Sequence, residues 1–70
     1  MHIGEAIKKE LERQGKNAAW FAEQLPCHRT HAYHILKQAS IDTQLLVRIS
    51  KILNHNFFAD QADELKNTSL

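Results

Sequence analysis

Apolar residues recur at intervals of three and four along most of this 70-residue chain, and residues that end helices interrupt the pattern at each break. Such spacing places apolar side chains on one face of an α-helix. No stretch shows the strict alternation of apolar and polar residues that is typical of a half-buried strand. The pattern therefore predicts an all-α fold.

Helix-capping residues divide the apolar pattern into short helices. The first ends at Gly15, a residue type that commonly follows the last turn of a helix. The second follows Asn17 as its N-cap and ends before Pro26, because proline disfavours helical geometry in the residue before it. The third begins near His28, and the fourth follows Asp42 as its N-cap.

A fifth helix is predicted after the asparagine-rich reversal at 54–56, where Phe57 and Phe58 begin a new apolar pattern. A chain of this length can form only one small domain, with a core too small for a deep pocket that excludes water. We place this domain at 1–66 and treat 67–70 as a frayed tail. The expected architecture is a compact bundle of four to five short helices.

The basic residues concentrate in the middle of the chain, although the formal net charge is only +1. Residues 13–51 contain six basic side chains and two acidic ones, whereas the other acids lie near the two ends. This distribution gives part of the fold a positive charge. No apolar run reaches the ~18 residues of a membrane span, and the single cysteine, Cys27, fits a reducing compartment. We therefore expect a cytoplasmic protein with no membrane partner.

The segment CHRTHAYHILK, residues 27–37, contains one cysteine, three histidines, an arginine and a tyrosine, and no acid. On a helical wheel, Ala32, Ile35 and Leu36 face the core. The opposite half carries side chains that can donate hydrogen bonds to base edges and phosphate oxygens: Arg29, Thr30, Tyr33, His34 and Lys37. The alternative is that this half is only a solvated polar face.

The same segment also contains a candidate metal site. Cys27, His31 and His34 follow one another at i, i+4 and i+7, a spacing that zinc ligands can adopt on one helix. A free cysteine more commonly packs as a small hydrophobic residue, so we expect Cys27 in the core and no metal or other cofactor. We also expect no enzyme, because the chain has neither a glycine-rich phosphate loop nor a nucleophile elbow.

Several features follow one another in order between residues 3 and 58. They are the opening Ile3-Gly4-Glu5, the Asn17 cap, Phe21-Ala22 with Leu25, the segment CHRTHAYHI with Arg29 near its start, and LLVRISKIL. This ordered set resembles the lambda-repressor-like (Cro/XRE) helix-turn-helix family. The resemblance implies that the second and third helices form a helix-turn-helix, that the third lies in the major groove of operator DNA, and that the protein binds as a dimer.

The chain departs from the family pattern at two places. Pro26 stands in the turn after the second helix, where the family commonly has glycine, and proline cannot adopt the positive φ that glycine can. That turn must therefore close differently. Late in the third helix the family often has an acid and then a glycine, whereas this chain has Leu36 and then KQAS.

The resemblance implies two sets of DNA contacts. The set that matches the groove-facing positions of the family would read bases: His28, Arg29, Thr30, Tyr33 and His34. Arg29 is the strongest candidate, because a guanidinium can bond guanine O6 and N7 together. The second set would hold the phosphate backbone: Asn17, Ala18, Lys37, Ser40 and Thr43.

These features predict a sequence-specific transcriptional regulator that binds double-stranded DNA as a homodimer. The alternative is a protein-interaction module, antitoxin-like or an adaptor, on the same fold. Trp20 falls opposite the apolar face of its helix, and an outward tryptophan can anchor a partner. Phe57 and Phe58 are adjacent and cannot easily face the same core, so we expect one of them to pack against a partner and the Phe57/Phe58 surface to belong to this alternative.

Overall fold

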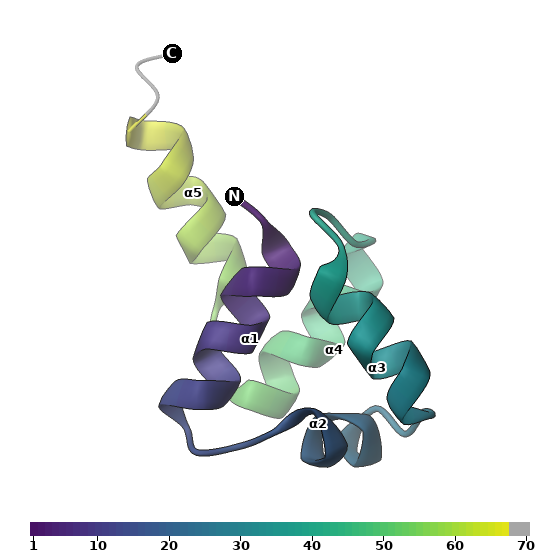
Figure 1. Ribbon diagram of the computed structural model, residues 1–70. Coiled ribbons are helices and arrows are strands. Elements are labelled where there is room, and N and C mark those ends of the chain that lie inside the picture. The colour runs from purple at the N-terminus through teal and green to yellow at the C-terminus, as the bar shows by residue number, and fades with distance from the viewer. Residues whose placement is uncertain (68–70) are drawn as a thin grey trace.

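The computed structural model describes residues 1–67 and contains five α-helices there (Figure 1). They are α1 (Ile3–Arg13), α2 (Ala18–Gln24), α3 (Arg29–Lys37), α4 (Thr43–Leu53) and α5 (Phe57–Asn67). Since these residues contain no strand, the all-α prediction is confirmed. None of the helices in this range is long and apolar enough to span a membrane. The last helix includes Asn67, one residue beyond the predicted domain end at 66, and the tail residues 68–70 lie outside the described part.

Two of the predicted N-caps form as the sequence indicates. Asn17 Oδ1 accepts a hydrogen bond from the Trp20 backbone N–H at 2.9 Å, and Asp42 Oδ1 accepts one from Leu45 at 2.8 Å. Each bond satisfies one of the free N–H groups in the first turn of its helix. His28 occupies the cap position of α3 but makes no side-chain cap bond. The His28 side chain is therefore available for other contacts at the start of α3.

The turn between α2 and α3 closes around Pro26 without a residue of positive φ. Proline has no N–H to donate, and the Cys27 N–H bonds the Ala22 carbonyl at 2.8 Å instead. Among residues 1–67, the positive φ values occur elsewhere, at Gly15 (72°) and Asn54 (49°). Asn54 directly follows α4 and Gly15 lies two residues after the end of α1, positions at which the left-handed conformation ends a helix. The chain thus joins α2 to α3 without a glycine in the turn.

The core lies where the first four helices meet the start of α5. Its largest fully buried side chains come from all five helices: Phe21, Phe57, Ile3, Ile7, Ile35, Ile49 and Leu53. Beyond Phe57, most of α5 is exposed, and this helix extends away from the other four (Figure 1). Burial therefore holds α1–α4 together as one unit, whereas α5 is attached mainly at its first turn.

The first turn of α1 lies directly against the end of α3. The N–H groups of Ile3 and Gly4 donate to the carbonyls of Ala39 and Gln38, both at 2.9 Å. A Cβ on Gly4 would lie 2.6 Å from the Leu36 carbonyl carbon and 2.8 Å from the Gln38 carbonyl oxygen. Because these are backbone atoms, a larger residue would force the two helices apart.

We expect the substitution Gly4→Ala to lower the free energy of unfolding by about 1–3 kcal/mol, the usual cost of overpacking a tight contact. Alanine favours a helix more than glycine does, so a loss of stability here would come from the clash. Urea denaturation would measure it. The matched control is Lys9→Ala, at an exposed position of the same helix, and equal stabilities of the two variants would contradict the close-approach explanation.

A buried carboxylate connects α1 to the end of α4. Glu10, only 7% exposed, accepts hydrogen bonds from Arg13 Nε at 2.9 Å and from Gln14 Nε2 at 2.7 Å. Gln14 Nε2 also donates to the Leu53 carbonyl at 2.7 Å, and His55 Nδ1 lies 3.6 Å from Glu10 Oε1. The hydrogen bond from Arg13 lowers the pKa of the Glu10 carboxyl to about 2, against the opposing effect of burial.

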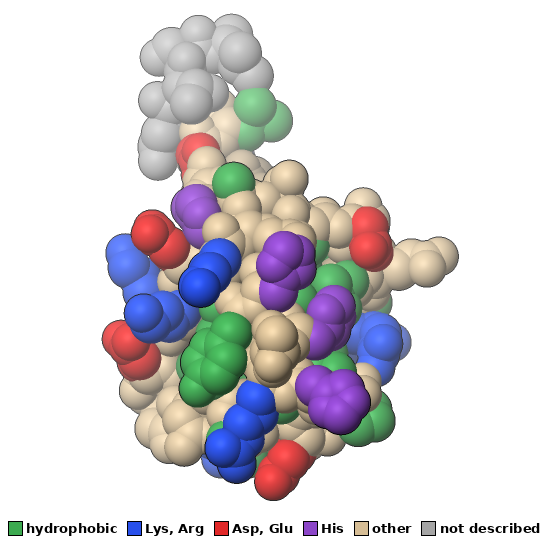
Figure 2. All heavy atoms as spheres, turned by 45° about the vertical axis from the view of Figure 1, so that its right-hand side comes forward, with side chains coloured by type: hydrophobic (Ala, Val, Ile, Leu, Met, Phe, Trp, Pro, Cys, Tyr) green, Lys and Arg blue, Asp and Glu red, His purple; other side chains and the backbone are tan. Residues whose placement is uncertain are grey.

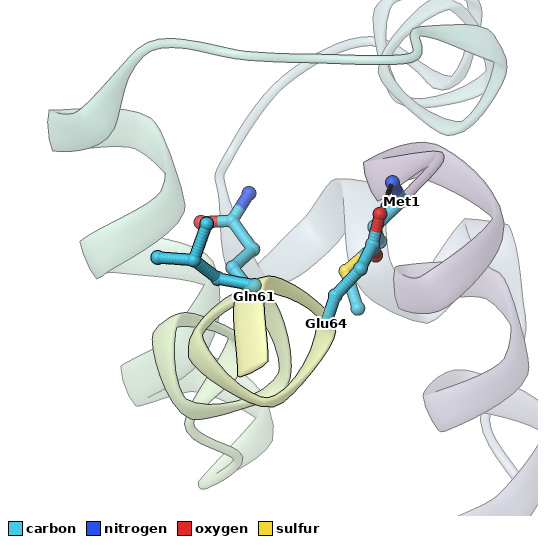
Figure 3. A pocket seen from close by; sticks show the side chains of 4 residues that line it. Met1, Gln61 and Glu64 are labelled. Atoms are coloured by element: carbon cyan, nitrogen blue, oxygen red, sulfur yellow. Dashed lines mark hydrogen bonds and ion pairs between the residues drawn. The ribbon is translucent and has the colours of Figure 1, made fainter. Parts of the chain in front are cut away.

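This network continues into α5. His55 Nε2 lies 2.7 Å from Asp60 Oδ2, and the His55 ring packs edge-on against Phe57 with 4.6 Å between ring centroids. A second link joins the first residue to the same helix, since the Met1 ammonium pairs with Glu64 (Figure 3). Polar contacts of Glu64 with Met1 and of Asp60 with His55, in the α4–α5 connection, thus supplement the burial of Phe57 in attaching α5.

We expect Glu10→Gln to lower the free energy of unfolding at pH 7 by about 1–3 kcal/mol, since the substitution removes a hydrogen-bonded, partnered charge. The folded carboxyl has a pKa of about 2 against an ordinary value of 4.5, so its contribution is complete above pH 4.5 and is lost as the pH falls toward 2. Denaturation of both proteins between pH 7 and pH 3 should show their difference shrinking below pH 4.5. A difference that stays constant over this range would contradict the role given to Glu10.

Candidate nucleic-acid interface

The exposed face of α3 carries the whole predicted base-reading set. Ala32 and Ile35 are buried, and this fixes which side of the helix faces the core. Every member of the set is exposed, from the N-cap to the second turn: His28, Arg29, Thr30, Tyr33 and His34. Figure 2 shows the side of the molecule that carries α3, where basic and histidine side chains gather and acidic ones lie toward the margin. The structure therefore presents a continuous donor-rich surface.

The candidate metal ligands are not brought together. Cys27 is half-buried and packs against the core, whereas His31 and His34 are exposed. The Gln38 amide nitrogen lies 2.7 Å from His34 Nε2, so a hydrogen bond within the end of α3 engages this ring. Within residues 1–67, no three histidine, cysteine or acidic side chains form a group that could hold a metal ion. Cys27 has the packing role that its residue type favours.

The predicted phosphate contacts lie at two places. Asn17, Ala18 and Lys37 line one hollow between α1, the start of α2 and α3, and Tyr33 lines it with them. Ser40 and Thr43 are exposed on the connection from α3 to α4 and on the first turn of α4, outside this hollow. Three of the five predicted phosphate contacts thus share a hollow with the base-reading residue Tyr33. Ser40 and Thr43 lie elsewhere as a separate pair.

Two lysines in the same hollow were missed by the sequence analysis. Lys16 lies directly before the Asn17 cap, and its Nζ is 4.8 Å from the centroid of the Trp20 ring. Its position beside a predicted contact was a signal that could have found it. Lys8 lies in α1 and joins the hollow through the packing of α1 against α3, for which the local sequence has no signal.

The residues of the alternative protein-binding surface separate in the structure. Phe57 is fully buried, so of the two adjacent phenylalanines it is Phe58 that can contribute to such a surface. Trp20 is half-buried against the core and carries the Lys16 ammonium over its ring. Phe58 is 36% exposed and shares a hollow between α4 and α5 with Val47, which is 38% exposed. Of the predicted surface Phe58 remains exposed, and it forms an exposed apolar pair with Val47.

Comparison of the chain with protein-family models, with curated proteins and with solved structures gave no match. Three other hollows in the described part of the chain have no residue of α3 in their lining. One is an open depression of about 270 Å³ beside Met1, Gln61 and Glu64, where the acid is already paired with the Met1 ammonium (Figure 3). The α3 face and the adjoining hollow are therefore the strongest functional candidates of the described surface.

Proposed function

We propose that this protein is a sequence-specific DNA-binding transcriptional regulator that places α3 in the major groove. The observation that carries the proposal is the acid-free exposed face of α3, which presents Arg29, Tyr33 and His34 together. Support also comes from α2, which packs against α3 through a short turn as in a helix-turn-helix. A cytoplasmic location agrees with this role and with the unpaired Cys27.

The geometry of α3 suits this role. The major groove of B-DNA is about 12 Å wide and admits one α-helix. In helix-turn-helix proteins the N-terminal residues of the recognition helix contact base edges, and Arg29 is the first residue of α3. Lys37 is the last residue of the same helix, where it can reach the phosphate backbone while Arg29 reads a base.

We further propose that the protein binds DNA as a homodimer. A net charge of +1 limits the affinity of one copy, because phosphate contacts supply most of nonspecific binding. Two linked copies would raise the effective concentration at neighbouring half-sites, about 34–36 Å apart. The exposed pair Val47 and Phe58 offers an apolar patch for the second copy, and the hollow that it lines contains none of the predicted DNA contacts.

Alanine variants separate base reading from backbone contact. Arg29→Ala should weaken binding to the specific site by about 1–3 kcal/mol and relax base choice at one position, because the bidentate bond to guanine is lost. Lys37→Ala should weaken specific and random duplexes by similar factors. Selection of binding sites from a random-sequence library, followed by affinity measurement, would test both variants. Equal losses on specific and random DNA for Arg29→Ala would instead make Arg29 a phosphate contact.

The dimer proposal predicts that Phe58→Ser weakens self-association by about 1–2 kcal/mol, because it removes an exposed aromatic side chain from the contact. Sedimentation equilibrium over a range of concentrations would measure this change. Gln61→Ser, at another exposed position of α5, is the control and should leave association unchanged. A wild-type protein that stays monomeric both alone and on a two-half-site duplex would contradict the proposal.

A further inference from the structure

A hollow of about 320 Å³ lies between α1, the start of α2 and α3, beside the proposed base-reading face. Its charged lining consists of three lysines, Lys8, Lys16 and Lys37, and one acid, Glu12. We call it the lysine hollow. Part of its wall is apolar, because it is lined by Leu11 of α1 and by Tyr33 and Leu36 of α3. The hollow thus combines positive charge with apolar surface.

The lysines of this hollow have no carboxylate partner in the described part of the chain. Among the ion pairs within residues 1–67, none involves Lys8, Lys16 or Lys37. Elsewhere on α1 the situation differs, because Arg13 is paired with Glu10. The charge of Arg13 is therefore neutralised within the fold, whereas Lys8, on the side of α1 that lines the hollow, keeps its positive charge available for a ligand.

Both the backbone and the side chain of Lys16 make contacts that fix its position. Its backbone N–H donates to the Leu11 carbonyl at 2.8 Å, and its ammonium lies 4.8 Å from the centroid of the Trp20 ring. A cation over an aromatic face is attracted by the ring and loses part of its freedom. Trp20, which the sequence suggested as a partner anchor, thus positions a charge beside Asn17 and the hollow.

We propose that the lysine hollow binds the sugar–phosphate backbone of DNA, with Lys8 and Lys16 as phosphate contacts that nothing in the sequence analysis assigned. This inference rests on the proposed function and extends the footprint from α3 to α1. The backbone alternates phosphate anions with deoxyribose rings, whose C–H faces are apolar. Lysines around an apolar wall match both parts. Because Tyr33 lines the hollow and belongs to the base-reading set, a strand beside the groove that α3 enters would pass over it.

The test is the salt dependence of binding to a random-sequence duplex, measured by fluorescence anisotropy with the full chain. Each phosphate contact contributes about 0.9 to the slope of log affinity against log salt concentration. Lys8→Gln and Lys16→Gln should each reduce the slope by about that amount and weaken binding at 0.15 M salt by about fivefold. The double variant should lose about 1.8 from the slope.

Two further variants act as controls. Lys9 follows Lys8 in α1 but lines a different hollow, which also contains Glu5, Glu10 and Asp60, so Lys9→Gln should leave the slope unchanged. Glu12→Gln removes the only acid among the residues that line the lysine hollow and should tighten binding. If substitutions in the hollow only damaged the fold, Glu12→Gln would weaken DNA binding as the lysine substitutions do. If Lys16→Gln is unfolded by circular dichroism, Lys16→Arg, which keeps the charge, should fold and bind as the wild type does.

The outcomes distinguish this inference from the proposed function. A double variant with the wild-type slope, while the wild type binds DNA in a salt-dependent way, would overturn the role of the lysine hollow and leave α3 as the DNA-binding element. A Lys9→Gln variant that loses as much slope as Lys8→Gln would also overturn it, because the effect would then follow total charge. A wild type that binds no duplex at low salt would overturn the proposed function itself.

Discussion

The close approach of Gly4 to the end of α3 is the contact on which the rest of the arrangement depends. The first N–H groups of α1 bond the carbonyls of residues 38 and 39, and the space between the two backbones is too small for a Cβ. Since α1 is bonded directly to the chain that leaves α3, the two helices cannot move independently. This contact therefore fixes the relative position of the two helices that line the lysine hollow, α1 with Lys8 and α3 with Lys37.

The positions of charges matter more in this protein than their total. Of the six basic residues between positions 13 and 51, two serve the fold, because Arg13 pairs with Glu10 and Arg48 Nη2 donates to the Leu25 carbonyl. Three others, Lys16, Arg29 and Lys37, lie on α3 or beside it. A chain of net charge +1 can thus present a locally basic surface to a polyanion, since nearby charges dominate at physiological salt.

Local signals in the sequence were sufficient to predict most of the fold. The caps at Asn17 and Asp42 mark helix starts because their side chains bond N–H groups three residues ahead. The burial of Ala32 and Ile35 follows from helical periodicity, so the exposed face of α3 could be predicted as well. The adjacent Phe57 and Phe58 indicated that one ring would be exposed, but which one depends on the direction of α5.

Apart from Lys16, which lies beside the Asn17 cap, the features that escaped sequence reasoning depend on contacts between distant parts of the chain. Glu10 meets His55 only because α1 packs beside the end of α4, and Lys8 meets Lys37 in one hollow only because α1 packs on α3. The close approach at Gly4 has the same origin, since it is set by carbonyls more than thirty residues away. No periodicity or capping pattern reports such contacts. The polar network and the full extent of the candidate interface therefore required the structure.

A backbone-amide NMR titration with a mixed-sequence duplex tests most directly whether α3 and the residues around it bind DNA, as we propose. With a chelator present, the amides of residues 17–18, 28–34 and 37–43 should shift on addition of DNA, and the shifts should diminish as the salt concentration rises. Unchanged amides in these ranges, with shifts on self-association confined to the surroundings of Val47 and Phe58, would contradict the claim. Such a result would make the protein an interaction module on a helix-turn-helix fold.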